Sequence, residues 1–150
     1  MRLWLIVPCL MAVVSGPAEA HAKSAPAVPE PGSASISIAL GRNDFRTYCA
    51  ACHGVSARGD GTIAEFLTIV APDLTHLRKL NAGIFPRERM TEVIDGRAEV
   101  KVHGARDMPV WGDWFEKEAA GPDTTRQARE IIVRERINAL VNYLESIQEN

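Results

Sequence analysis

The stretch Cys49-Ala50-Ala51-Cys52-His53 decides how the rest of the chain is interpreted. Three ordinary kinds of site compete for two cysteines so spaced and followed at once by a histidine. A zinc site requires four ligands, usually from two separated pairs, and the adjacent Cys52 and His53 could hardly bind one metal together. A thioredoxin-like redox pair wants a βαβ context, which is missing here. A structural disulfide fits the spacing but gives His53 no role.

The same five residues form the pattern for covalent attachment of c-type haem. At the end of a helix, Cys49 and Cys52 lie about one turn apart, so their sulfur atoms can reach the two vinyl groups on one edge of the porphyrin. His53 then directs its imidazole toward the iron. The pattern occurs once in the chain. It predicts one haem, attached through Cys49 and Cys52 and ligated by His53.

The first twenty residues have the pattern of an export signal rather than of a folded element. Arg2 gives a positive start, and an apolar run from Leu3 to Val14 follows. Ala18-Glu19-Ala20 then provides a small-x-small cleavage site. An uncleaved anchor is the alternative, but the run is short for a membrane span. We expect residues 1–20 to be a cleavable signal peptide, the protein to be periplasmic, and no integral membrane span to remain after cleavage.

Composition indicates a single domain after this signal. The 150-residue chain has 46% hydrophobic and 24% charged residues, which is typical of one globular protein. Its formal net charge of -2 gives no electrostatic reason to expect nucleic acid as a partner. Residues 21–35 are rich in Ala, Pro and Ser and lack an apolar period, which predicts a flexible leader. The folded domain is then expected over residues 36–150.

An amphipathic helix is predicted at the start of this domain. Ser35 or Ser37 can cap it. Residues spaced by three, four and three positions then form one apolar face: Ile38, Gly41, Phe45 and Tyr48. Because Gly41 lies inside this stripe, we expect it to permit the close approach of another helix.

The partner of that helix is predicted at the other end of the domain. From about Thr124 to Gln148 the chain lacks proline and glycine, and Asp123 or Thr124 can cap its start. Its apolar positions repeat at four, three, four and three residues: Val133, Ile137, Leu140, Leu144 and Ile147. This periodicity predicts a long helix with one buried face.

Short helices and loops fill the middle of the chain. Gly54 to Gly61 predicts a turn-rich loop, and Thr75 to Leu80 a single helical turn. Pro86 to Ile94 predicts a helix that ends before Gly96. No segment shows strand alternation, so the fold class is all-α. Because the middle of the chain has few apolar residues, we expect the core to be completed by a group other than side chains.

The motif leaves the sixth iron ligand open among His76, Met90, His103 and Met108. Met90 falls inside the helix predicted from Pro86, where a methionine is more often a core residue. Met108 lies in a predicted loop, and His103 in the same loop is its main competitor. The choice matters because Met/His ligation raises the reduction potential.

The order of these motifs resembles class I cytochromes c, the small monohaem family of electron carriers. Gly41 and Phe45 match its N-terminal helix pattern. Ala71-Pro72-Asp73-Leu74 matches its Gly-Pro-x-Leu element, with alanine in place of glycine. The C-terminal helix pattern matches Leu140, Tyr143 and Leu144. The resemblance runs from about Ile36 to Ile147.

This resemblance implies a cytochrome c fold, in which the N- and C-terminal helices cross and short helices and loops wrap around one covalent haem. It assigns to the Pro72 carbonyl a hydrogen bond from His53. It also matches the family's axial Met-Pro pair to Met108 and Pro109, and so favours Met108 as the sixth ligand.

The function implied is that of a one-electron carrier with redox proteins as donor and acceptor, and not of an enzyme. A cytochrome subunit of a dehydrogenase or oxidase complex would perform the same chemistry in a fixed assembly. A haem enzyme or gas sensor would instead need a labile sixth ligand. Basic residues between Arg78 and Arg106 alternate with acidic ones, a mixture more typical of a solvated surface than of a docking patch.

Overall fold

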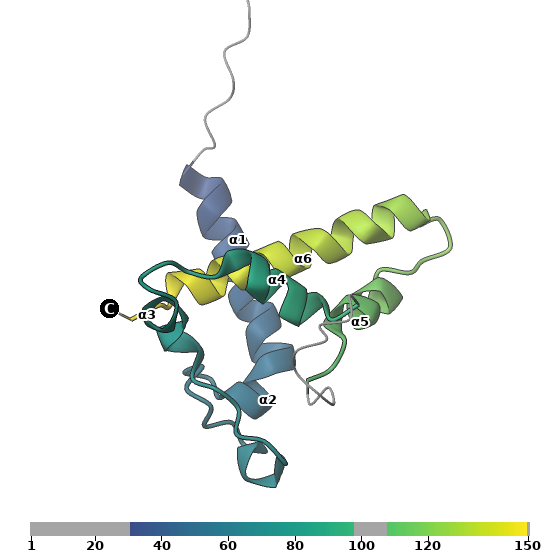
Figure 1. Ribbon diagram of the computed structural model, residues 1–150. Helices are drawn as coiled ribbons and strands as arrows, with labels where there is room; N and C mark the ends of the chain where they lie inside the picture. Colours follow the sequence, from purple (N-terminus) through teal and green to yellow (C-terminus); the bar gives the residue numbers. More distant parts are fainter. Residues whose placement is uncertain (1–30, 98–107, 150) are drawn as a thin grey trace, which may run out of the picture.

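The computed structural model describes residues 31–97 and 108–149 (Figure 1). The predicted signal peptide, most of the predicted leader, and His103 and Arg106 lie outside the described residues. Every element within the two described ranges is helical. The predicted all-α fold class is therefore confirmed for this part of the chain.

The domain begins with one nearly continuous helical stretch. Helix α1 spans Pro31–Asp44, a π-helical segment η1 follows at Phe45–Cys49, and α2 spans Ala50–His53. Gly54 follows directly with a φ of +79°, a backbone conformation that favours glycine. The two cysteines and the histidine of the motif thus lie at the end of a helical stretch.

The π-helical turn η1 is a feature that the sequence did not predict. A π-turn spans one more residue than an α-turn, so it rotates the residues that follow relative to the face of α1. The apolar spacing of three and four residues is that of a plain α-helix and holds no signal for this change. Phe45 is still buried and Tyr48 is half-buried, as the stripe indicated.

Helix α6, Arg126–Ser146, crosses α1 (Figure 1). A Cβ atom on Gly41 would lie 1.9 Å from the carbonyl oxygen of Ala139, so the backbones meet where only glycine fits. The Phe45 and Tyr143 rings pack beside this point with centroids 5.3 Å apart. The predicted contact between the terminal helices at Gly41 is confirmed.

Helix α1 begins at Pro31 rather than at Ser35 or Ser37. Proline is tolerated in a first helical turn because its missing N–H is not needed there. Ser35 lies inside the helix, where its hydroxyl donates to the carbonyl oxygen of Gly32 at 2.9 Å. Residues 31–35, which the sequence places in the flexible leader, are therefore helical.

Helix α6, by contrast, starts later than predicted. Its cap is Thr125 and not Asp123 or Thr124. Thr125 has the extended backbone of a cap, and its hydroxyl accepts a hydrogen bond from the N–H of Ala128 at 3.2 Å.

The prediction of a helix after Pro86 is confirmed. Helix α4 spans Arg87–Asp95, and Gly96 ends it with a left-handed φ of +67°. Between α2 and α4 lie three short elements in place of the single helical turn that was predicted: η2 at Ala64–Phe66, η3 at Leu74–His76 and α3 at Leu77–Leu80.

Helix α5, Trp111–Glu118, was not predicted. The loop predicted around Met108 was expected to continue through Trp111 and Gly112, with Pro109 and Gly112 fixing its backbone. Gly112 is instead buried within the helix, where a Cβ would lie 2.0 Å from Oδ1 of Asp95. The glycine therefore permits a close contact between α5 and the end of α4.

The core is built mainly from one face of α6 and the elements packed on it. The largest fully buried side chains are Phe45, Phe115, Val133, Ile137, Leu140 and Val141. In the part of the chain that the structure describes, no helix combines the length and the apolar character that crossing a membrane requires.

Candidate cofactor site

A cavity lies beside the core, between the motif and the short elements of the middle of the chain. Its volume is about 260 Å³, several times the roughly 30 Å³ that one water molecule occupies in the liquid. Most of its lining is apolar: Phe45, Tyr48, Cys49, Cys52, His53, Leu67, Thr68, Ile69, Ala71, Pro72, Leu74, Leu77, Met90, Val93, Ile94, Met108, Pro109, Trp111, Leu140 and Leu144. The cavity provides room for the apolar group that the sequence analysis expected in the core.

Both motif cysteines face this cavity as free thiols. Burial, with smaller contributions from Asp44 and Cys52, raises the pKa of the Cys49 thiol to about 12. Catalytic and redox cysteines have lowered pKa values, because the thiolate is the reactive form. A protonated Cys49 thus disfavours the thioredoxin-like interpretation of the pair.

His53 lies on the same wall of the cavity. Its Nδ1 is 3.4 Å from the carbonyl oxygen of Pro72, which is long for an N–H···O hydrogen bond. Burial lowers the pKa of His53, and the contact with Pro72 opposes this only in part. The imidazole is therefore neutral at pH 7, and with Nδ1 donating to Pro72 its Nε2 can bind a metal.

Met108 and Met90 both line the cavity. Met108 precedes α5, whereas Met90 projects from α4 with Val93 and Ile94 beside it on the cavity wall. Met90 was one of the candidate sixth ligands, although its place inside a predicted helix favoured a core role. The apolar spacing of Met90, Val93 and Ile94 along α4 is the signal that could have placed it at the cavity.

His76 does not contribute to the cavity lining. Its Nδ1 lies 3.1 Å from a carboxylate oxygen of Asp73, and its Nε2 lies 3.7 Å from Glu149. These contacts disfavour His76 as an iron ligand. His103, the other histidine candidate, lies outside the described residues.

An aromatic wall closes another side of the cavity. The rings of Tyr48 and Trp111 both line it, with centroids 5.6 Å apart, and the Phe115 ring packs against Tyr48 at 5.5 Å. The Tyr48 hydroxyl donates to the carboxylate of Glu118 at 3.0 Å. These contacts connect the motif helix with α5.

Arg136 of α6 supports this wall from behind. Its guanidinium lies 3.9 Å from the centroid of the Phe115 ring, a cation–π geometry. The same group donates to Asp44 at 3.0 Å and to Glu118 at 2.7 Å. The role of Arg136 was not predicted, because an arginine on an amphipathic helix gives no local sign of such partners.

The residues around the cavity fit a covalently attached haem. Two thiols, a neutral imidazole and a thioether converge on one apolar cavity, which suits a porphyrin with bound iron. Across residues 31–97 and 108–149, no three His, Cys, Asp or Glu side chains are grouped so that they could hold a metal ion by themselves. The site therefore defines a c-type haem protein.

Comparison with known families agrees with this class. The family model for cytochrome c matches residues 38–148, and the chain belongs to the cytochrome c family. Its cofactor is accordingly haem c, attached at the Cys-x-x-Cys spacing of Cys49 and Cys52. Comparisons with curated proteins and with solved structures gave no significant match.

Proposed function

We propose that the protein is an extracytoplasmic one-electron carrier whose single haem c is ligated by His53 and Met108. Membership of the cytochrome c family implies haem-based electron transfer. The observation that supports the finer proposal is that Cys49, Cys52, His53 and Met108 line one apolar cavity. When bound, the haem supplies an iron centre that accepts and releases one electron.

Each residue has a separate role in this proposal. Cys49 and Cys52 hold the porphyrin edge through thioether bonds. His53 binds the iron through Nε2, while its Nδ1–H donates to the Pro72 carbonyl and fixes the ring. Met108 contributes a soft thioether, which favours reduced iron and raises the reduction potential. Two such ligands leave no coordination position for a substrate, so a carrier is favoured over a haem enzyme or gas sensor.

The apolar lining supports the same role. A hydrophobic shell keeps water away from a metal centre and thereby tunes its reduction potential. Among the described residues that line the cavity, none is lysine, arginine, aspartate or glutamate. The site thus has few groups suited to acid–base catalysis, although it has every ligand that electron transfer requires.

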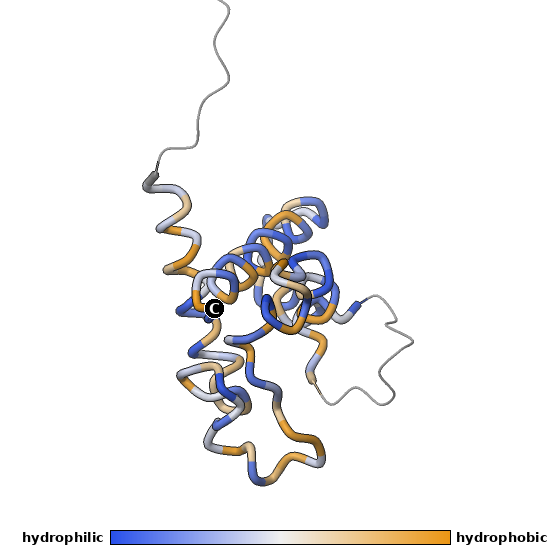
Figure 2. The backbone as a smooth tube through the Cα atoms, turned by 60° about the vertical axis from the view of Figure 1, so that its left-hand side comes forward, coloured by the Kyte–Doolittle hydropathy of each residue, from blue (hydrophilic) through white to orange (hydrophobic). Residues whose placement is uncertain are grey.

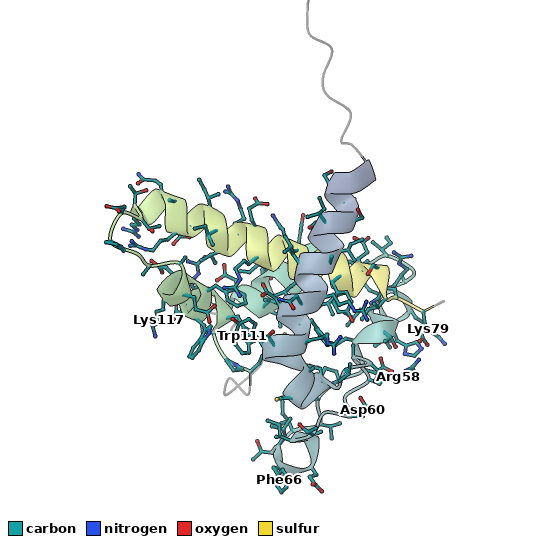
Figure 3. The ribbon with its side chains drawn as sticks, turned by 180° about the vertical axis from the view of Figure 1, so that it is seen from behind. Arg58, Asp60, Phe66, Lys79, Trp111 and Lys117 are labelled. Atoms are coloured by element: carbon teal, nitrogen blue, oxygen red, sulfur yellow. The ribbon has the colours of Figure 1, made fainter. Side chains whose placement is uncertain are left out.

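A redox partner with an apolar contact surface fits the exterior of this cavity. The loop over residues 62–70 supplies Leu67, Thr68 and Ile69 to the lining, and Figure 2 shows hydrophobic residues along the loop at the bottom of the view. Phe66 is exposed at the tip of this loop (Figure 3). Val70 is 89% exposed, and Glu65 is the one charged residue of the loop. We therefore infer that partners dock on this loop by apolar contact.

Three of the described arginines of the middle segment are paired with acidic residues of the chain, which disfavours them as a docking patch. Arg78 and Arg87 pair with Glu145 of α6, and Arg97 pairs with Asp95 at 2.6 Å. Charges neutralised within the chain produce little of the one-sided field that steers a charged partner.

The proposal includes the organisation of the N-terminal region. Residues 1–20 act as a cleavable export signal, residues 21–35 as a leader that becomes helical from Pro31, and residues 36–150 as the cytochrome c domain.

The purified protein provides the test of this function. After denaturation and acid-solvent extraction the polypeptide should keep its colour, with an intact mass equal to residues 21–150 plus one haem. The reduced form should resist carbon monoxide, because both axial positions are occupied. Rapid formation of a carbon monoxide adduct would instead indicate a labile sixth ligand and overturn the carrier proposal.

A further inference from the structure

The side chain of Gln148, just beyond α6, bonds to the loop that follows Pro72. Its Oε1 accepts a hydrogen bond from the backbone N–H of Arg78, and its Nε2 donates to the carbonyl oxygen of Leu74, both at 2.8 Å. A second donated bond of 2.8 Å returns to the carbonyl oxygen of Leu144 in α6. Both N–H groups and the oxygen of this half-buried amide have partners, which fixes its orientation.

The two backbone groups that bond to Gln148 would be bonded to each other in a regular α-helix. Leu74 and Arg78 are four residues apart, so their carbonyl and N–H are the pair that one α-helical hydrogen bond would join. The Gln148 amide spans this pair across the junction of η3 and α3. A side chain that enters the helical ladder in this way alters the course of the backbone. Gln148 therefore fixes how the loop passes into α3.

Glu149 makes one further contact with the same loop and one with a segment nearer the motif. Its N–H donates to the carbonyl oxygen of Thr75 at 2.8 Å, and its carboxylate pairs with Arg58. Figure 1 shows α3 beside the end of α6, and Figure 3 shows Arg58 and Lys79 in this region. Arg58 and Glu149 are each almost half exposed, so their ion pair contributes less than the bonds of the half-buried Gln148 amide.

The loop is attached to the haem-binding motif on its other side. The N–H of Leu74 donates to the carbonyl oxygen of Ala57 at 2.8 Å, close to the motif in the chain. Pro72, two residues earlier, presents its carbonyl oxygen to Nδ1 of His53 at 3.4 Å. This distance is near the long limit of an N–H···O hydrogen bond, so the strength of the bond depends steeply on the position of the loop.

We propose that Gln148 is a positioning residue for His53. By fixing the segment from Leu74 to Arg78, it sets the distance between the Pro72 carbonyl and Nδ1 of His53. The inference rests on the proposed ligation of the haem iron by His53. A hydrogen bond from Nδ1 makes the imidazole a stronger donor to the metal, which favours oxidised iron. Release of the loop weakens that bond and raises the reduction potential.

The test compares Gln148→Leu with Gln127→Leu in the haem-loaded protein. Gln127 is exposed in the first turn of α6, so it undergoes the same chemical change far from the loop. The reduction potential is measured, together with the hydrogen–deuterium exchange rate of the His53 Nδ1 proton in the reduced protein by NMR. Gln148→Leu should raise the potential and speed the exchange, whereas Gln127→Leu should match the wild type in both.

A second variant, Gln148→Met, keeps the length and the neutral charge of the side chain but can make neither the bond from Arg78 nor the bond to Leu74. It should shift both quantities in the same direction as Gln148→Leu, and it serves as the test if Gln148→Leu does not retain haem. A Gln148 variant with a lower melting temperature but wild-type potential and exchange rate would overturn the inference, since Gln148 would then stabilise only the fold. If the wild-type protein lacked a His53-ligated haem, the proposed function itself would fail.

Discussion

Replacing Gly41 tests the contact on which the fold depends. A Cβ at this position would lie 1.9 Å from the carbonyl oxygen of Ala139 and 2.9 Å from the backbone nitrogen of Leu140. The first distance is about 1.5 Å short of ordinary van der Waals contact. Because both neighbours are backbone atoms, α1 and α6 must move apart and lose dispersion contacts along the crossing. For Gly41→Leu we expect a loss of about 3 kcal/mol or more, the upper end of overpacking costs.

Thermal unfolding of the haem-loaded protein, followed by circular dichroism, measures this loss. At roughly 4 °C per kcal/mol for a domain of this size, the melting temperature should fall by about 10 °C or more. Gly32→Ala is the matched control, because a Cβ at Gly32 would have no atom within 4 Å. It should leave stability unchanged or slightly raised, since alanine favours helices more than glycine does. A Gly41→Leu protein that melts with the wild type would refute the close crossing.

Two further predictions concern the site. Met108→Ala should abolish the weak near-infrared sulfur-to-iron band of the oxidised protein and lower the reduction potential. The control Met90→Leu should keep the band. If His103→Ala changes the spectrum and the potential while Met108→Ala changes neither, the iron is ligated by two histidines. Phe66→Lys should slow electron self-exchange between two copies of the protein at low salt, because the two lysines then repel each other where the loops over residues 62–70 meet. High salt should restore the rate. Ile131→Lys, on an exposed part of α6, should not slow it; equal effects of both lysines would argue against docking at this loop.

The features that the sequence predicted correctly have local signals. The motif from Cys49 to His53 lies within five residues, and its chemistry does not depend on the rest of the fold. The helices that became α1 and α6 show regular apolar spacing, and Gly41 within one stripe indicated where another backbone would approach. Gly96 marked the end of α4 because a left-handed residue there favours glycine.

The features that the sequence missed depend on partners distant in the chain. Gly112 is a buried contact with Asp95, seventeen residues earlier, and nothing near it distinguishes that role from a turn. Arg136 pairs with carboxylates on α1 and α5. Gln148 bonds to the Arg78 N–H and the Leu74 carbonyl, some seventy residues earlier, in place of the α-helical bond that would join these two groups. Such roles exist only once the chain has folded, so periodicity and spacing hold no signal for them.

The short helices around the cavity explain why the middle of the chain contains few apolar residues. Helices α3, α4 and α5 contain four, nine and eight residues, fewer than the roughly 12–15 that an isolated helix needs for even marginal stability in water. Each sends a side chain to the cavity wall: Leu77 from α3, Met90 from α4 and Trp111 from α5. A haem in the cavity gives these elements one shared apolar surface. The cofactor therefore replaces the side chains that a core between these helices would otherwise require.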